Sequence, residues 1–268
     1  MSLLLRAGAW DGVTPEEAGW RYLSFRVVHG STRFETGGEE VVLVPLFGDA
    51  LVRADGEEWE VGGRASVFDA LPRSLYVPRD SAVEIEGEAE LAVCGARADR
   101  RREARPIPPE DVEIEVRGSG NATRQISHIV KPEFPAERIL VVEVYTPAGN
   151  WSSYPPHKHD EERGDAEAVL EETYYFRTRT GAPGAFAVQR LYSPRHGLDL
   201  TETVRDGDLL QVPFGYHTTV AAHGYDLYYL NALAGGRRTM QAADDPDLAW
   251  VRPAWRDLQP DPRVPMVR

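Results

Sequence analysis

The sequence predicts an all-β protein made of two similar halves, each a β-sandwich or barrel. Short runs of β-branched and aromatic residues recur along the chain, and Gly, Pro and Asp turn signals separate them. Glycine and proline contribute 24 and 20 of the 268 residues, which disfavours a helical bundle. Two short stretches, residues 14–18 and 166–170, have a helical pattern. The expected fold class is therefore all-β.

In the first half we expect eight short strands. They cover residues 20–28, 40–47, 50–54, 58–61, 66–71, 74–77, 83–85 and 90–95. The pair Asp55-Gly56 between two of these runs is a hairpin signal. A charged run over residues 98–105, followed by three prolines within four residues, is typical of an exposed linker. We therefore divide the chain into domains at 1–110 and 111–268.

The second half has the same pattern of strands and turns. Its expected strands cover residues 112–116, 138–145, 172–179, 185–192, 198–204, 209–212, 217–221 and 225–232. Residues 68–76 align without gaps on residues 209–217, which places Tyr76 opposite His217 and suggests an internal duplication. The Pro-rich segment from Asp245 contains Trp250 and Trp255, and we expect these to pack it back onto the body.

Charge and composition exclude several classes of partner. Thirty Lys and Arg against 43 Asp and Glu give a formal net charge of −13, which argues against nucleic acid or an anionic membrane as main partner. A small anionic substrate remains compatible, because one local cation can bind it. The one cysteine, Cys94, allows no intrachain disulfide, and no apolar run approaches the roughly 20 residues of a membrane span. We expect a cytoplasmic protein.

Histidines concentrate the chemistry in the second half, where five of the seven lie between residues 157 and 223. On a strand, His157 and His159 point to one face while Lys158 points away. Glu172 opens a later strand, and His217 follows a turn. Three imidazoles and a carboxylate with open positions suit a divalent metal (Zn, Mn, Fe, Ni or Co), and ligand type alone does not choose among them.

The residues around these candidate ligands resemble the motifs of known protein families. His-x-His, a later Glu, and Gly-x5-Pro-x-Gly-x-His over residues 207–217 are similar to the metal motifs of the cupin superfamily. The strings GNWSSYPPHKHD (149–160) and EETYYF (171–176) resemble the bacterial 5-deoxy-glucuronate isomerase family of myo-inositol catabolism. Residues 14–21, 118–125 and 255–265 resemble the same family. The 5-keto-4-deoxyuronate isomerase family shares the His-x-His, Glu-x-Tyr and final His pattern.

The resemblance implies a bicupin, two tandem double-stranded β-helix (jelly-roll) barrels, with the metal in the second. The first barrel then supports the second and offers a surface for a homo-oligomer. One departure affects the ligand set, because twelve residues separate His159 from Glu172 where cupins have three or four. Six carboxylates lie in this insert, which we expect to be mostly a solvated loop, and Glu171 stays an alternative ligand. The family pattern of Glu before x-Tyr favours Glu172.

The resemblance also implies a reaction, the aldose–ketose isomerisation of 5-deoxy-D-glucuronate to 2-deoxy-5-keto-D-gluconate. Moving a proton between neighbouring carbons passes through an enediolate, whose charge a Lewis acid stabilises while a general base moves the proton. Candidates for the catalytic groups are Tyr174, Gln189 and Tyr216, and a metal-bound hydroxide is a further candidate for the base. Candidates for binding the small anionic sugar-acid substrate are Lys158, Arg177 and Arg190.

Other readings of the two metal motifs remain open. Another metal-dependent cupin enzyme, either a uronate isomerase or an Fe(II) oxygenase, would use the same ligands. A non-catalytic sugar-binding bicupin is the third alternative. We expect His223 to be structural or to lie behind the ligands, His196 to be a solvated loop residue, and Cys94 to be buried.

Overall fold

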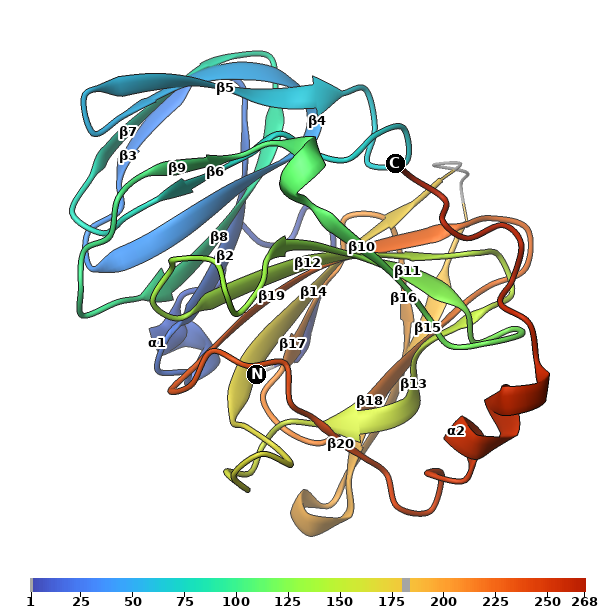
Figure 1. Cartoon of the computed structure of the whole chain (residues 1–268). Coiled ribbons are helices and arrows are strands. Elements are labelled where there is room, and N and C mark those ends of the chain that lie inside the picture. Colours follow the sequence, from blue (N-terminus) through green and yellow to red (C-terminus); the bar gives the residue numbers. More distant parts are fainter. Residues whose placement is uncertain (1, 180–183) are drawn as a thin grey trace.

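The computed structural model describes residues 2–179 and 184–268 and is nearly all β, as predicted. The chain forms two packed units of β-strands, the first drawn in blue to teal and the second in green to red (Figure 1). No helix among the described residues is long and apolar enough to cross a membrane.

All strands of the first unit belong to one eight-stranded sheet, in which one long strand pairs with four others. Its strands are β2 (Leu23–His29), β3 (Thr32–Glu35), β4 (Glu39–Ala54), β5 (Glu57–Arg64), β6 (Ser74–Val77), β7 (Ala82–Gly87), β8 (Glu90–Arg97) and β9 (Arg105–Ile107). The order along the sheet is β2-β8-β4-β6-β9, and β3, β5 and β7 pair with each other or with the second half of β4. The first half of β4 therefore pairs with β6 and β8, and its second half pairs with β5 and β7.

The second unit is a sandwich of two sheets, one of seven and one of five strands. Its strands are β10 (Glu113–Arg117), β11 (Arg124–Val130), β12 (Ile139–Thr146), β13 (Trp151–Lys158), β14 (Leu170–Thr178), β15 (Ala187–Ser193), β16 (Leu198–Val204), β17 (Leu209–Val212), β18 (Tyr216–Ala221), β19 (Leu227–Gly235) and β20 (Ala243–Asp244). The seven-stranded order is β1-β17-β14-β19-β12-β11-β10, and the five-stranded order is β16-β15-β18-β13-β20.

The N-terminal strand β1 (Leu4–Leu5) belongs to the sheet of the second unit. It pairs with β17, just as β9 pairs with β6 in the first unit, so β2-β8-β4-β6-β9 corresponds to β12-β19-β14-β17-β1. Pairing changes from the first unit to the second between β9 and β10, near the boundary we predict at residue 110. The first few residues nevertheless complete the second unit, which a division by sequence alone misses.

The strand register corrects the predicted alignment of Tyr76 with His217. Tyr76 lies on β6 opposite Val42 of β4, and its counterpart in the β14–β17 pair is Gln211. His217 lies on β18, which corresponds to β7 instead. The ungapped match fails because the connections between strands differ in length in the two halves.

Helices are few and short. They are α1 (Pro15–Ala18), η1 (Pro109–Asp111), η2 (Pro194–His196), α2 (Val251–Ala254) and η3 (Trp255–Asp257). The helix predicted at residues 14–18 is confirmed: Thr14 and Glu17 form a reciprocal capping box at its start. The helix predicted at 166–170 is wrong, because residues 166–169 form an irregular segment and Leu170 begins β14.

The acidic insert before β14 is anchored rather than solvated throughout. The Glu167 side chain is fully buried and accepts hydrogen bonds from Lys158 Nζ at 2.8 Å and from the backbone N–H groups of Asp160 and Glu161 at 2.9 and 3.0 Å. A buried carboxylate with this many donors holds its loop in one conformation. The expectation of a mostly solvated loop is therefore corrected at Glu167.

Two carboxylates, one from each unit, bind the backbone of the other unit. Glu40 on β4 accepts from the N–H groups of residues 137–139 at the start of β12, at 2.6 to 2.8 Å. Glu171 on β14 accepts from those of residues 21–23 at the start of β2, at 2.6 to 2.9 Å. The two contacts are equivalent under the strand correspondence above. They are charge-assisted hydrogen bonds, which fix how the two units meet.

The C-terminal segment, red in Figure 1, runs along the second unit and ends beside the first. The Gln125 amide holds its end, since Oε1 accepts from the N–H groups of Met266 and Val267, and Nε2 donates to Val267 O at 2.8 Å. The segment packs back as predicted, but Trp250 is 65% exposed and Val251 and Val267 are buried instead.

A buried ion pair crosses between the units. Arg64 at the end of β5 donates through Nη2 to Glu143 Oε1 on β12 at 2.5 Å, and both side chains are wholly inaccessible to solvent. The hydroxyls of Tyr145 and Tyr228 donate to the same carboxylate at 2.9 and 2.8 Å. All three groups, the Arg64 guanidinium and the two hydroxyls, donate to the one carboxylate of Glu143.

We predict that Glu143→Gln lowers the free energy of unfolding by about 3–5 kcal/mol, because it leaves the buried Arg64 charge unpaired. The control is Glu60→Gln, which removes an exposed ion pair with Arg73 and should cost under about 1 kcal/mol. Urea unfolding of the two variants measures both values. Equal losses in the two variants would contradict a structural role for the buried pair.

Candidate metal centre

Strand β13 carries the histidine pair after a local distortion. Ser153 adopts a left-handed conformation at φ 50°, and the pairing of β13 with β18 shifts register between Ser152 and His157. Non-glycine residues in this conformation are strained and are often found at functional sites. Beyond the distortion, His157 lies directly opposite His217 on β18.

Three side chains converge in the interior of the second unit: His159, Glu172 and His217. Each is buried, and their ligand atoms lie within 4.8 Å of one another. Glu172 Oε2 is 2.9 Å from His159 Nε2 and 3.3 Å from His217 Nε2. His157 is partly buried, with its ring centroid 4.6 Å from that of His217. The four residues come from the end of β13, from β14 and from β18.

The backbone orients two of the imidazoles. His159 Nδ1 donates to Leu170 O at 2.9 Å, and His217 Nδ1 donates to Gly215 O at 3.1 Å. Each Nε2 then carries the lone pair and turns toward Glu172. Metal-binding histidines usually have this arrangement, with the second nitrogen donating to a carbonyl or carboxylate.

The cluster fits a divalent metal ion. His217 Nε2 is buried, and no group among the described residues gives it a hydrogen bond of good geometry. Two ligand atoms at about 2.0–2.2 Å from one ion lie roughly 2.8–3.6 Å apart at octahedral or tetrahedral angles. The separations of 2.9 and 3.3 Å from Glu172 therefore suit ligands that share an ion. Imidazole nitrogens and a carboxylate oxygen are also the donors such ions prefer.

The protonation states favour metal binding. Burial alone would raise the pKa of Glu172, but the hydrogen bond to His159 and the nearby imidazole of His217 lower it to about 2. Burial and the neighbouring imidazoles of His217 and His159 lower the pKa of His157 well below its usual value. For His159, Glu172 outweighs the effect of burial and raises the pKa. Because a metal binds the neutral imidazole, metal affinity falls as the pH falls into the range in which these histidines are protonated.

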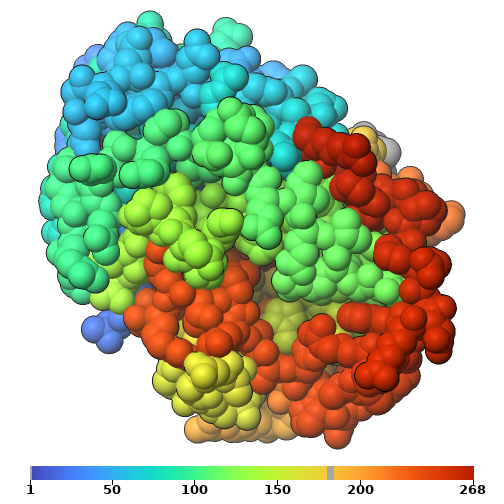
Figure 2. All heavy atoms as spheres, in the orientation of Figure 1, coloured from blue at the N-terminus to red at the C-terminus, as the bar shows by residue number. Residues whose placement is uncertain are grey.

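The cluster lies in a cavity that opens on the surface of the second unit. Figure 2 shows the hollow between the green surface of β10 and β11 and the orange-red surface of the chain after β19. Its empty volume, open solvent at the mouth included, is about 840 Å³. Its polar and charged lining consists of Arg117, Arg124, His128, Ser153, His157, His159, Glu172, Tyr174, Tyr229, Asn231, Asp244 and Arg252.

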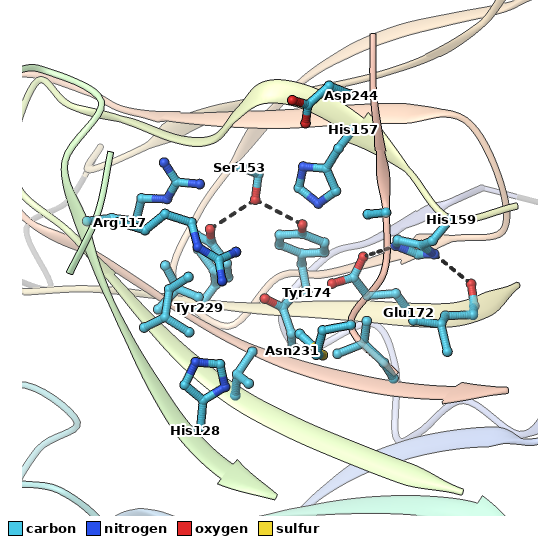
Figure 3. A pocket seen from close by; sticks show the side chains of 18 of the residues that line it. Arg117, His128, Ser153, His157, His159, Glu172, Tyr174, Tyr229, Asn231 and Asp244 are labelled. Atoms are coloured by element: carbon cyan, nitrogen blue, oxygen red, sulfur yellow. Dashed lines mark hydrogen bonds and ion pairs between the residues drawn. The ribbon is translucent and has the colours of Figure 1, made fainter. Parts of the chain in front are cut away.

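Of the three predicted catalytic residues, Tyr174 lines the cavity. Its hydroxyl is 3.2 Å from Ser153 Oγ, which is also 3.2 Å from the Tyr229 hydroxyl (Figure 3). Gln189 is buried against Thr219, and Tyr216 packs against the Tyr192 ring. Neither Gln189 nor Tyr216 is among the lining residues.

The three predicted substrate-binding cations lie outside the lining, each beside carboxylates. Lys158 pairs with Asp160 and Glu167. Arg177 pairs with Glu90 of the first unit and with Asp206. Arg190 pairs with the exposed Asp199. Each of these charges is therefore already matched by a carboxylate, and none of the three side chains is among the described residues that line the cavity.

Sequence reasoning missed the arginines that do line the cavity, Arg117, Arg124 and Arg252. The sequence held a signal for two of them. Arg124 belongs to the string GSGNATRQ, and Arg117 directly precedes that string. That string forms the turn between β10 and β11, which pairs Arg117 with Arg124. Arg252 comes from α2 in the C-terminal segment, and nothing local predicts its position.

The remaining predicted positions are peripheral. His223 is exposed in the turn after β18, which corrects the expectation of a structural role close to the ligands, and His196 is exposed in η2, as predicted. Cys94 is a buried free cysteine on β8, as expected. Glu171 points to the first unit, as described above, so the carboxylate in the cluster is Glu172.

Two jelly-roll units with a buried His/Glu cluster in the second define a bicupin with a candidate metal site. The sequence profile of the KduI/IolB family matches residues 6–251, and the chain belongs to this family. A curated relative, the 5-deoxy-glucuronate isomerase of Geobacillus kaustophilus, is 45% identical over 247 residues, which cover 89% of each chain.

Solved structures agree with this assignment. The crystal structure of an IolB-like protein from Salmonella typhimurium has a TM-score of 0.89 at 35% identity and covers 94% of this chain and all of its own. Oxalate decarboxylase of Bacillus subtilis, which has Mn(II) centres, has a TM-score of 0.59 at 14% identity. It covers 87% of this chain and 74% of its own, and it shares the fold alone.

We predict that His217→Ala weakens the binding of Mn(II) and Zn(II) by at least about 100-fold, because it removes one ligand of the cluster. The matched control, His223→Ala, removes an exposed histidine and should bind metal as the unaltered protein does. Elemental analysis and calorimetric titration measure both. Unchanged metal content in His217→Ala would exclude His217 as a ligand.

Proposed function

We propose that this chain is a metal-dependent isomerase that converts 5-deoxy-D-glucuronate to 2-deoxy-5-keto-D-gluconate in myo-inositol catabolism. The observation that carries the proposal is the buried His159–Glu172–His217 cluster at one end of a polar cavity. It occurs in a chain 45% identical to a relative named for this activity.

We propose that His157, His159, Glu172 and His217 hold the ion. His157 is not in the group whose ligand atoms lie within 4.8 Å of one another, but its ring centroid is 4.6 Å from that of His217 and 6.4 Å from that of His159, which supports it as the fourth ligand. A divalent metal bound here would supply Lewis-acid stabilisation for the negative charge that develops during enolisation. Zn, Mn, Fe, Ni and Co are all compatible with this donor set.

Tyr174 is placed to act on the substrate as a hydrogen-bond donor. Burial and the charge of Glu172 raise the pKa of Tyr174 well above its usual value, so the hydroxyl keeps its proton. A protonated hydroxyl beside the cluster can donate to a substrate oxygen as its charge grows, which is the preorganised stabilisation that such reactions need. Ser153 and Tyr229 fix the direction of that hydroxyl.

Apolar groups also line the cavity. Leu170 and Leu233 lie among the lining residues, and both are buried. Apolar neighbours lower the local dielectric constant, which strengthens electrostatic contacts to a charge that develops on the substrate.

The test is turnover without oxygen. Protein reconstituted separately with each of the five metals is incubated anaerobically with 5-deoxy-D-glucuronate, and the ketose is measured by NMR. We expect conversion with at least one metal, none after chelation, and none in Glu172→Gln. Absence of turnover with all five metals contradicts the proposal, and turnover that requires O₂ would favour a cupin oxygenase instead.

Two further expectations belong with this proposal. A cytoplasmic location is supported by the buried free thiol of Cys94, since reduced cysteines are usual in a reducing compartment. A homo-oligomer stays a prediction, which light scattering of the purified protein would decide.

A further inference from the structure

Three arginines line the cavity, and two of them already have their charge matched. Arg117 donates to both oxygens of Glu115, through Nε and Nη2, each at 2.7 Å. Arg252 binds both oxygens of Asp244. Such bidentate pairs leave little net charge for an anionic ligand.

Arg124 differs from both. Its side chain is 3% exposed, and Nη1 donates to two backbone carbonyls, Ala122 O at 3.1 Å and Tyr154 O at 3.3 Å. Within residues 2–179 and 184–268, no carboxylate lies within 4 Å of its guanidinium. A buried charge without a counter-ion is costly, so a site of this kind is suited to an anion that enters the cavity.

The charge on Arg124 is present at neutral pH. Burial, together with the nearby positive charges of Arg117 and Arg252, lowers the pKa of Arg124 to about 10. The guanidinium therefore stays protonated while being poorly solvated. An incoming carboxylate can relieve this state by two parallel N–H···O bonds from the same planar group.

Arg124 lines the cavity from β11, whereas the residues of the metal cluster come from the end of β13, from β14 and from β18. It is the direct register partner of Arg117, and Figure 3 shows Arg117 on one side of the cavity and His159 with Glu172 on the other. Tyr174 and Ser153 lie between the two sides. A linear ligand can therefore reach the cluster with one end and the arginine with the other.

We propose that Arg124 binds the substrate carboxylate and makes the site select a sugar acid over an uncharged sugar. This rests on the proposed function. In 5-deoxy-glucuronate the carboxylate is on C6, whereas the proton moves between C1 and C2 at the other end of the chain. Holding C6 at Arg124 orients C1 and C2 toward the His/Glu cluster, and no bond to the carboxylate changes in the reaction.

The experiment compares two substrates in three variants. The substrates are 5-deoxy-D-glucuronate and 5-deoxy-D-glucose, in which an uncharged hydroxymethyl group replaces the carboxylate. For Arg124→Gln we expect kcat/KM to fall on the order of 100-fold for the acid and to change less than about 3-fold for the uncharged sugar. Arg124→Lys should recover part of the loss through its charge. The control, Arg33→Gln, removes an exposed arginine of the first unit and should alter neither value.

A binding measurement separates this proposal from the proposed function. Metal-free protein cannot turn over a substrate that needs the metal, so calorimetry reports its affinity for 5-deoxy-D-glucuronate alone. We expect Arg124→Gln to bind it at least about 10-fold more weakly than the unaltered protein. If no metal supports turnover but this difference is found, the carboxylate site stands and the isomerase proposal fails.

Two results would overturn the assignment of Arg124. One is an equal loss of kcat/KM on both sugars, which would indicate a structural role in holding Ala122 O and Tyr154 O. The other is metal-free binding that Arg124→Gln leaves unchanged, or that the unaltered protein lacks.

Discussion

The alternation of side chains along one strand governs both the assembly and the chemistry of this protein. Glu171 and Glu172 are neighbours on β14, so they point to opposite faces of the sheet. Glu171 binds three backbone N–H groups of the first unit, and Glu172 meets His159 and His217 in the cavity. The contact that joins the two units therefore also fixes the strand that presents the carboxylate ligand.

The strand correspondence shows how the two units differ at the position of Glu172. The first unit has the same inter-unit contact, made by Glu40 on β4, but the residue after it is Val41, which is buried in an apolar cluster. The second unit keeps the contact and follows it with Glu172. The exchange of Val41 for Glu172, together with the histidines at the end of β13 and on β18, gives the second unit a polar centre where the first has an apolar one. Strand β1, which precedes the first unit in the sequence, pairs with β17 of the second unit and so links the two units further.

Local patterns predicted what depends on local geometry. The period of a strand places His157 and His159 on one side, and the turn before His217 returns the chain to them. The choice between Glu171 and Glu172 could not be made from spacing, because either residue can face inward after a loop of unknown shape. The cavity arginines were missed because Arg252 arrives from a distant segment, and because the role of Arg124 depends on its lack of a counter-ion. The register of Tyr76 failed for a similar reason, since loop lengths between strands are invisible to an ungapped match.

The most direct measurement compares Glu171→Gln with Glu172→Gln, by metal titration and by urea unfolding of the metal-free protein. The account predicts that Glu172→Gln loses metal affinity by at least about 100-fold. It predicts that Glu171→Gln keeps metal affinity within about 3-fold but loses about 2–4 kcal/mol of unfolding free energy, because three backbone donors lose a charged acceptor. Equal loss of metal in both variants, or unaltered metal binding in Glu172→Gln, would contradict the separation of the two roles.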